Sequence, residues 1–115
     1  HTGERNCFFR DIQGNKKLKP LPFETPSRLE EVIKDRLVRK PENSYTVRLF
    51  LEGEDRVLQK FGEEAIETLI ALKNSQKDQI LLETADLLYS LILSLVVKGV
   101  AWQEVMEELA KRFKE

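Results

Sequence analysis

The sequence contains one cysteine and one histidine, and this scarcity excludes several kinds of site. The lone cysteine, Cys7, cannot form a disulfide within the chain, which is typical of proteins from the reducing cytoplasm. The lone histidine is His1, far from every acidic cluster, so the Glu-x-x-His pairs of a di-iron carboxylate bundle cannot form. We therefore expect a cytoplasmic protein without a disulfide framework and without a di-iron centre.

An excess of either charge is also missing, because 19 basic residues stand against 20 acidic ones. Without a strongly basic field, we expect no nucleic-acid partner. No basic leader followed by an apolar stretch marks secretion. The apolar run over residues 80–97 is interrupted by polar side chains and predicts a core helix rather than a membrane span: Glu83, Asp86, Ser90 and Ser94. We therefore expect no membrane partner.

Strand-like alternation is absent after residue 27, so the fold class expected is all-α. Apolar spacing predicts four main helices and a short one, over residues 27–40, 46–51, 54–73, 76–98 and 101–114. Ser27 with Glu30 and Ser75 with Asp78 have the spacing of capping boxes. Gly99 is placed to end a helix, and Ala101 begins the last helix without a capping oxygen, so that start should fray.

The apolar residues of the helix over 54–73 are expected to form a core face: Val57, Leu58, Phe61, Ala65, Leu69 and Leu72. In the helix over 46–51, Val47, Leu49, Phe50 and Leu51 are expected to point mostly inward. The helix over 76–98 is apolar almost all round, and three partner helices of one short chain scarcely cover it. We therefore expect a helical bundle that is completed by a homodimer.

Acidic residues are spaced to converge on two of these helices. Glu63, Glu64 and Glu67 lie within about one quadrant of the first helix, and Glu83 and Asp86 share a face of the second. Two like charges ~4 Å apart repel by about 4 kcal/mol at an effective dielectric of 20, so a cation is expected between them. Carboxylate oxygens favour Mg²⁺ or Mn²⁺. The alternative for the first group is a solvated face paired with Lys60.

The pattern Glu-Glu-x-x-Glu followed by Glu-x-x-Asp resembles the signature of the all-α nucleoside-triphosphate pyrophosphohydrolase superfamily. Within it, the sequence is most similar to the phosphoribosyl-ATP pyrophosphohydrolase family of histidine biosynthesis. The resemblance runs from about residue 29 to residue 113. Its other matching segments are Pro41–Thr46, Leu49–Phe50, Gly53, Asp55–Arg56, Lys60 with Gly62, and Ala85–Tyr89.

The resemblance implies a dimer and the Mg²⁺-dependent hydrolysis of phosphoribosyl-ATP to phosphoribosyl-AMP and pyrophosphate. It also implies metal ligands on both helices: Glu64, Glu67, Glu83 and Asp86. Glu63 would orient or deprotonate the attacking water, or serve as a further metal ligand, and Lys60 and Arg56 would neutralise phosphate oxygens. Ser44, Tyr45 and Thr46 match a family segment and either contact the substrate or cap and brace the short helix.

The first ten residues resemble the end of the phosphoribosyl-AMP cyclohydrolase motif Cys-His-Thr-Gly-x-x-Ser-Cys-Phe, with Asn6 in place of serine. The alternative is an ordinary strand or tail. On the resemblance, residues 1–10 end a cyclohydrolase-like domain, residues 11–26 are a proline-rich extended linker, and residues 27–115 are the pyrophosphohydrolase domain. Cys7 and His1 alone cannot complete a tetrahedral zinc site, so no zinc is expected in this chain.

Two other functions remain open at this stage. A house-cleaning hydrolase of the same superfamily, acting on ordinary or damaged nucleoside triphosphates, would have an identical metal core. A non-catalytic helical dimerisation module would carry the same acidic residues as a salt-bridge network.

Overall fold

The computed structural model describes residues 19–114, and this part of the chain is all-helical. The 3-10 turn η1 (Pro22–Glu24) leads into α2 (Thr25–Arg39), followed by α3 (Tyr45–Leu51), α4 (Glu54–Asn74), α5 (Lys77–Lys98) and α6 (Trp102–Ala110). No strand occurs among the described residues, so the predicted fold class is confirmed for them. The cyclohydrolase-like segment over residues 1–10, with His1 and Cys7, lies outside the described residues.

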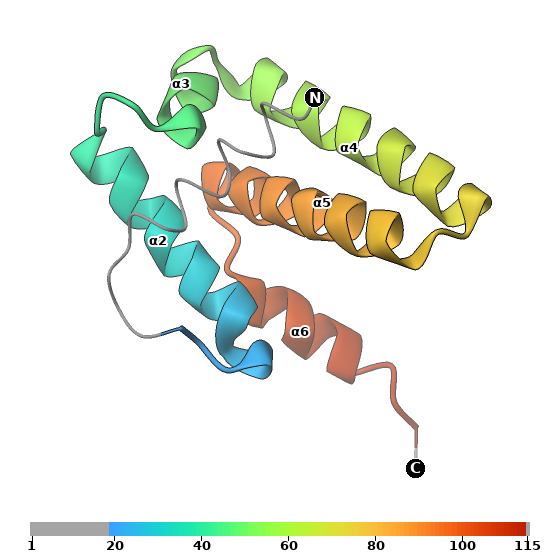
Figure 1. Cartoon of the computed structure of the whole chain (residues 1–115). Coiled ribbons are helices and arrows are strands. Elements are labelled where there is room, and N and C mark those ends of the chain that lie inside the picture. The colour runs from blue at the N-terminus through green and yellow to red at the C-terminus, as the bar shows by residue number, and fades with distance from the viewer. Residues whose placement is uncertain (1–18, 115) are drawn as a thin grey trace.

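The longest helices, α4 and α5, form an antiparallel hairpin, and the other helices gather at one end of it (Figure 1). Two contacts fix the register of the hairpin. Near the α4–α5 turn, the Thr68 hydroxyl donates to the Glu83 carbonyl at 3.1 Å. At the far end, the Lys98 ammonium lies 3.1 Å from the Glu54 carboxylate. Because the two helices run antiparallel, the numbers of two residues that face each other across the hairpin add up to about 151. Glu64 therefore lies opposite residue 87.

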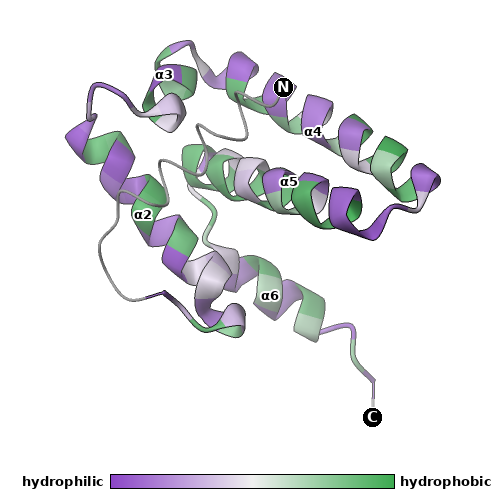
Figure 2. Ribbon diagram, viewed as in Figure 1, coloured by the Kyte–Doolittle hydropathy of each residue, from purple (hydrophilic) through white to green (hydrophobic). Residues whose placement is uncertain are grey.

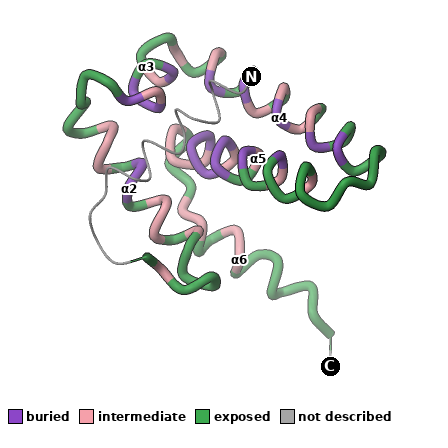
Figure 3. Tube along the Cα trace, viewed as in Figure 1, coloured by how far each residue is buried: buried purple, intermediate pink, exposed green. Residues whose placement is uncertain are grey.

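The hydrophobic core lies where α2, α3, the start of α4 and the C-terminal half of α5 meet: Ile33, Leu49, Val57, Tyr89, Ile92 and Leu93. Burying each aliphatic side chain of this kind contributes about 1.5–3 kcal/mol. The opposite end of the hairpin, near the α4–α5 turn, lies outside this core and is mostly exposed (Figure 3). The core therefore fixes one end of the hairpin, and the contacts between α4 and α5 extend beyond it.

The predicted core face of α4 is wrong for the single chain. Of its six residues only Val57 is buried, whereas Leu69 and Leu72 are 65% and 52% exposed. Hydrophobic and hydrophilic residues alternate along α4 (Figure 2). Three of the five residues that α4 buries are polar. The buried residues of α4 are Val57, Lys60, Glu64, Thr68 and Ala71. Leu51 in α3 was also expected to point inward, but it is 64% exposed.

The start of the first long helix differs from the prediction. The helix α2 begins at Thr25, two residues earlier than the predicted capping box at Ser27 allows. Pro22 and Pro26 fit helix starts because the first turn requires no backbone N–H donor. Glu30, the predicted partner of Ser27, instead accepts a hydrogen bond at 2.9 Å from the backbone N–H of Trp102. Glu30 therefore supplies α6 with an acceptor from a distant helix.

The other helix ends were predicted with mixed success. Gly99 ends α5 with φ 75°, as expected. Ser75 does not begin a capping box, because it ends α4 in a left-handed conformation with φ 59° and α5 starts two residues later. Asp78 accepts from the neighbouring N–H of Gln79 at 3.1 Å. The last helix ends at Ala110 rather than at residue 114.

By length and composition alone, α5 is apolar enough to cross a membrane. Two of its carboxylates, Glu83 and Asp86, are buried within the bundle. Charged groups at the centre of a membrane span are costly, whereas a core helix can place them against a facing helix. The arrangement therefore fits the core helix that the sequence predicts.

Candidate metal centre

The carboxylates of Glu64, Glu83 and Asp86 converge between α4 and α5. Oxygens from the three side chains lie within 4.8 Å of one another, and the residues are only 0%, 8% and 6% exposed. The antiparallel register brings this about, since Thr68, one turn after Glu64, bonds to the carbonyl of Glu83. The three-residue spacing of Glu83 and Asp86 directs both toward α4.

Glu64 is the most deeply buried acid of the cluster, and its two oxygens have different surroundings. Its Oε1 lies 2.9 Å from the Lys60 Nζ, in an ion pair whose side chains are both 1% exposed. Its Oε2 is buried and accepts no hydrogen bond from the described residues. Burial raises the pKa of Glu64; the hydrogen bond and charge of Lys60 oppose this, and the charges of Glu67 and Glu83 add to it.

These residues fit a hard divalent cation. All three ligands offer carboxylate oxygens, the donor type that Mg²⁺ and Mn²⁺ prefer. With Mg²⁺–oxygen distances of about 2.1 Å, opposite ligands stand about 4.2 Å apart, which the observed spacing of up to 4.8 Å nearly matches. A buried carboxylate oxygen without a donor is the kind of atom that a cation satisfies. The buried acidic cluster could therefore hold a divalent metal ion.

The other two predicted acids lie toward the edge of this cluster. Glu67 is half-buried one turn after Glu64, and its carboxylate is not among the three that converge. The Glu63 carboxylate is 43% exposed; it accepts from the Gln59 amide at 3.3 Å and lies 3.8 Å from the Arg56 guanidinium. Arg56 also pairs with a carboxylate of the preceding turn. Lys60 and Arg56, which are predicted to serve one site, therefore belong to two separate ion pairs: Lys60 to a buried one and Arg56 to an exposed one.

The Ser44–Thr46 segment has clear structural contacts. The Ser44 hydroxyl accepts from the backbone N–H of Val47 at 3.2 Å and so caps α3. The hydroxyls of Thr46 and Tyr89 share a buried hydrogen bond of 2.7 Å that joins α3 to α5. The Arg48 guanidinium lies 5.7 Å from the centre of the Tyr45 ring. These contacts favour the capping and bracing interpretation, while substrate contact stays a prediction.

A hollow of about 420 Å³ opens beside the cluster, at the α4–α5 turn. Glu67 and Glu83 form its inner wall. The remaining lining consists of aliphatic and amide side chains: Ile70, Ala71, Asn74, Gln76 and Gln79. Sequence reasoning missed these residues, although three amide side chains within six positions of a helix turn were a visible signal.

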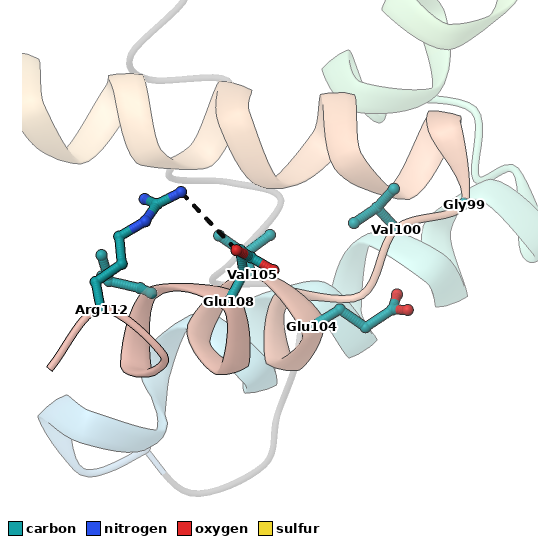
Figure 4. A pocket seen from close by; sticks show the side chains of 7 residues that line it. Gly99, Val100, Glu104, Val105, Glu108 and Arg112 are labelled. Atoms are coloured by element: carbon teal, nitrogen blue, oxygen red, sulfur yellow. Dashed lines mark ion pairs between the residues drawn. The ribbon is translucent and has the colours of Figure 1, made fainter. Parts of the chain in front are cut away.

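A second hollow, of about 410 Å³, lies along α6 and the segment before it (Figure 4). Val100, Val105 and Leu109 give it an apolar floor, and Glu104 and Glu108 add negative charge. The Arg112 guanidinium reaches the Glu108 carboxylate at 3.9 Å. None of the three converging carboxylates lines this hollow, so it is separate from the candidate metal centre.

Comparison with known proteins agrees with this geometry. Residues 27–113 match the model of the family described as phosphoribosyl-ATP pyrophosphohydrolase. The chain is 60% identical over 114 residues to the "Histidine biosynthesis bifunctional protein HisIE" of Aquifex aeolicus, covering 99% of this chain and 56% of the relative. Proteins of that name from Pyrococcus furiosus and Thermotoga maritima are 41% and 40% identical, each over 99% of this chain and 54% and 57% of the relative.

The chain thus spans little more than half the length of these relatives. The family match covers the whole of α3, α4, α5 and α6 and includes both acidic motifs. On this match, the chain belongs to the phosphoribosyl-ATP pyrophosphohydrolase family.

Proposed function

We propose that this chain hydrolyses phosphoribosyl-ATP to phosphoribosyl-AMP and pyrophosphate, as a Mg²⁺-dependent step of histidine biosynthesis in the cytoplasm. The observation that supports it best is the buried convergence of Glu64, Glu83 and Asp86. Like charges that are gathered in a protein interior repel one another strongly, and a divalent cation between the carboxylates would offset that repulsion. Family membership then indicates which phosphoanhydride is cleaved.

Glu64, Glu83 and Asp86 would hold the ion, with Glu67 at the open side toward the hollow. When bound, Mg²⁺ or Mn²⁺ supplies Lewis-acid polarisation of phosphate oxygens. Lys60 favours the ionised form of Glu64 and opposes the burial that raises its pKa, because its ammonium lies 2.9 Å from the carboxylate. A liganding carboxylate must be deprotonated, so this ion pair prepares the site for the metal.

Glu63 is suited to receive a proton from the attacking water, since its carboxylate is partly exposed and the residue directly precedes Glu64. The water oxygen forms a bond to phosphorus, the anhydride bond breaks, and the bond's electron pair leaves on pyrophosphate. The water proton passes to Glu63, so no covalent intermediate is needed. Arg56, 3.8 Å from Glu63, would neutralise phosphate oxygens at the exposed edge.

We also infer a homodimer, from two rows of apolar residues that are exposed or only half-buried in the described part of the chain. On α4 the row consists of the residues expected in the core: Leu58, Phe61, Ala65, Leu69 and Leu72. At about 100° per residue these lie on one side of the helix. Leu88 and Leu95 fall on the corresponding side of the antiparallel α5, and Leu88 is 40% exposed. A second copy would bury both rows, at about 1.5–3 kcal/mol for each leucine.

The same comparison supports a proposal about the domain boundaries. The relatives are named as bifunctional and are nearly twice as long as this chain. We propose that residues 27–115 form the pyrophosphohydrolase domain, that residues 1–10 end a cyclohydrolase-like domain, and that residues 11–26 connect the two. Cys7 and His1 alone are too few to hold zinc stably.

The test is pyrophosphate release with Mg²⁺ from phosphoribosyl-ATP, compared with ATP, dUTP and dCTP. We expect phosphoribosyl-ATP to be turned over fastest. Equal or faster turnover of dUTP or dCTP would instead support the house-cleaning function, and no release from any nucleotide would support the dimerisation module.

Two variants of the cluster link this activity to its residues. Glu64→Gln and Asp86→Asn remove negative charge and little volume, so each should keep its helical circular dichroism while pyrophosphate release falls at least 100-fold. Gln103→Leu on α6 is the control and should retain activity. Full activity in both cluster variants would remove these residues from the site.

A further inference from the structure

The hollow beside the acidic cluster has walls of two chemical kinds. Its inner wall contains Glu67 and Glu83, and its outer wall contains the amides of Asn74, Gln76 and Gln79. We propose that the outer wall binds the nucleoside part, base and ribose, of the substrate, while the phosphates lie at the acidic cluster. This inference rests on the proposed function because it assigns a further part of the same substrate.

The position of the hollow supports this assignment. Glu83 belongs to the converging carboxylates and also lines the hollow, so the hollow begins where the cluster ends. Its volume of about 420 Å³ falls within the range of about 300–1,000 Å³ that small-molecule sites occupy. A nucleotide whose phosphates reach the cluster therefore has its sugar and base next to these walls.

The lining chemistry fits an uncharged group better than a phosphate. No lysine or arginine lines the hollow, whereas three side-chain amides do. Each amide can both donate and accept hydrogen bonds, which is how asparagine and glutamine bind purine edges and sugar hydroxyls. Ile70, which is 54% exposed, offers an aliphatic surface to the flat face of a base.

The amides are available for a ligand. Gln76 is the N-cap residue of α5, yet its side chain makes no capping hydrogen bond. The residues Asn74, Gln76 and Gln79 are all exposed. They carry no charge that would require a counter-ion. Replacing their hydrogen bonds to water by hydrogen bonds to a nucleoside therefore costs little free energy.

The hollow also stays open in the proposed dimer. At about 100° per residue, Glu67, Ile70 and Asn74 share one side of α4, at spacings of three and four. Leu58, Leu69 and the rest of the apolar row lie on the other side. A partner that covers the apolar row would therefore leave the amide wall accessible.

The test separates the two ends of the ligand. We would measure binding, by calorimetry with Mg²⁺, of α,β-methylene-ATP and of inorganic tripolyphosphate, which has no nucleoside, to wild type, Gln79→Leu and Asn74→Leu. Gln103→Leu, an exposed substitution of the same kind on α6, is the control. We expect each hollow variant to lose about tenfold in affinity for the methylene nucleotide, while tripolyphosphate and Mn²⁺ bind as in wild type.

Three results would overturn the assignment: unchanged nucleotide affinity in both hollow variants, an equal loss for tripolyphosphate, or no nucleotide binding by wild type. Failure of the proposed function gives a different pattern. In that case wild type binds the methylene nucleotide through the amide wall but releases no pyrophosphate from phosphoribosyl-ATP.

Discussion

Replacing Lys60 by methionine tests whether its ammonium stabilises the acidic cluster. The substitution keeps an unbranched stem and removes the ammonium, with its charge and its hydrogen-bond donors, that lies 2.9 Å from Glu64. Removing one partner of a buried ion pair costs about 3–5 kcal/mol, because the other charge is left uncompensated. Glu64 can limit that loss by taking up a proton, since its ordinary pKa is 4.5 and burial already raises it.

The amount of stability that Lys60→Met can lose therefore depends on pH, because it cannot exceed the cost of protonating Glu64. Protonating a carboxyl of ordinary pKa 4.5 costs about 1.36 kcal/mol for each pH unit above that value, or about 3.4 kcal/mol at pH 7 and about 0.7 kcal/mol at pH 5. We therefore expect Lys60→Met to lose about 3 kcal/mol of unfolding free energy at pH 7 and less than about 1 kcal/mol at pH 5. Mg²⁺ should restore part of the loss at pH 7, because it supplies positive charge to the same oxygens.

The measurement is urea unfolding followed by far-ultraviolet circular dichroism, at fixed protein concentration, with EDTA or with Mg²⁺. Lys34→Met is the matched control, since Lys34 is exposed on α2 and its replacement should change stability by no more than about 0.5 kcal/mol. An equal loss at both pH values that Mg²⁺ does not relieve would refute the reasoning, and Lys60 would then contribute through packing alone.

Two further predictions concern the protonation of Glu64, and two concern other parts of the molecule. Because burial raises the pKa of Glu64, protons should compete with the metal at a higher pH than at an ordinary glutamate. Mn²⁺ affinity should therefore fall as pH drops through that raised pKa, and constant affinity down to pH 4.5 would contradict it. The raised pKa also means that, without metal, protonated Glu64 stabilises the fold. This contribution to the free energy of unfolding is fully present below pH 4.5, and it is lost as pH rises through the pKa that Glu64 has in the folded protein. Leu69→Glu places a charge in the apolar row of α4 and should weaken dimerisation at least tenfold by sedimentation equilibrium, whereas Gln103→Glu should not; a monomeric wild type would remove the dimer. Thr46→Val leaves the Tyr89 hydroxyl without its 2.7 Å partner and should cost about 1–3 kcal/mol in urea unfolding, with kcat/KM nearly unchanged if Thr46 only braces α3. A loss of kcat/KM without loss of stability would instead indicate substrate contact.

The comparison of sequence and structure is most informative on α4. Periodicity correctly predicts a helix, but it assigns Leu69 and Leu72 to the core and leaves Lys60 among possible surface charges. In the structure the leucines are exposed and the lysine is 1% exposed. Hydrophobic spacing identifies an apolar side of a helix without saying whether the same chain or a second copy covers it.

The sequence alone determined that the described chain is helical, where its long helices run to within a few residues, and that the acidic residues fall on one side of each of two helices. These properties depend on spacing along the chain, and helical spacing is local. Only the tertiary structure decided which acids meet: it brings Glu64 to Glu83 and Asp86, pairs it with Lys60, and leaves Glu63 at the exposed edge. The physical reason is the antiparallel register of α4 and α5, which depends on contacts between residues far apart in sequence.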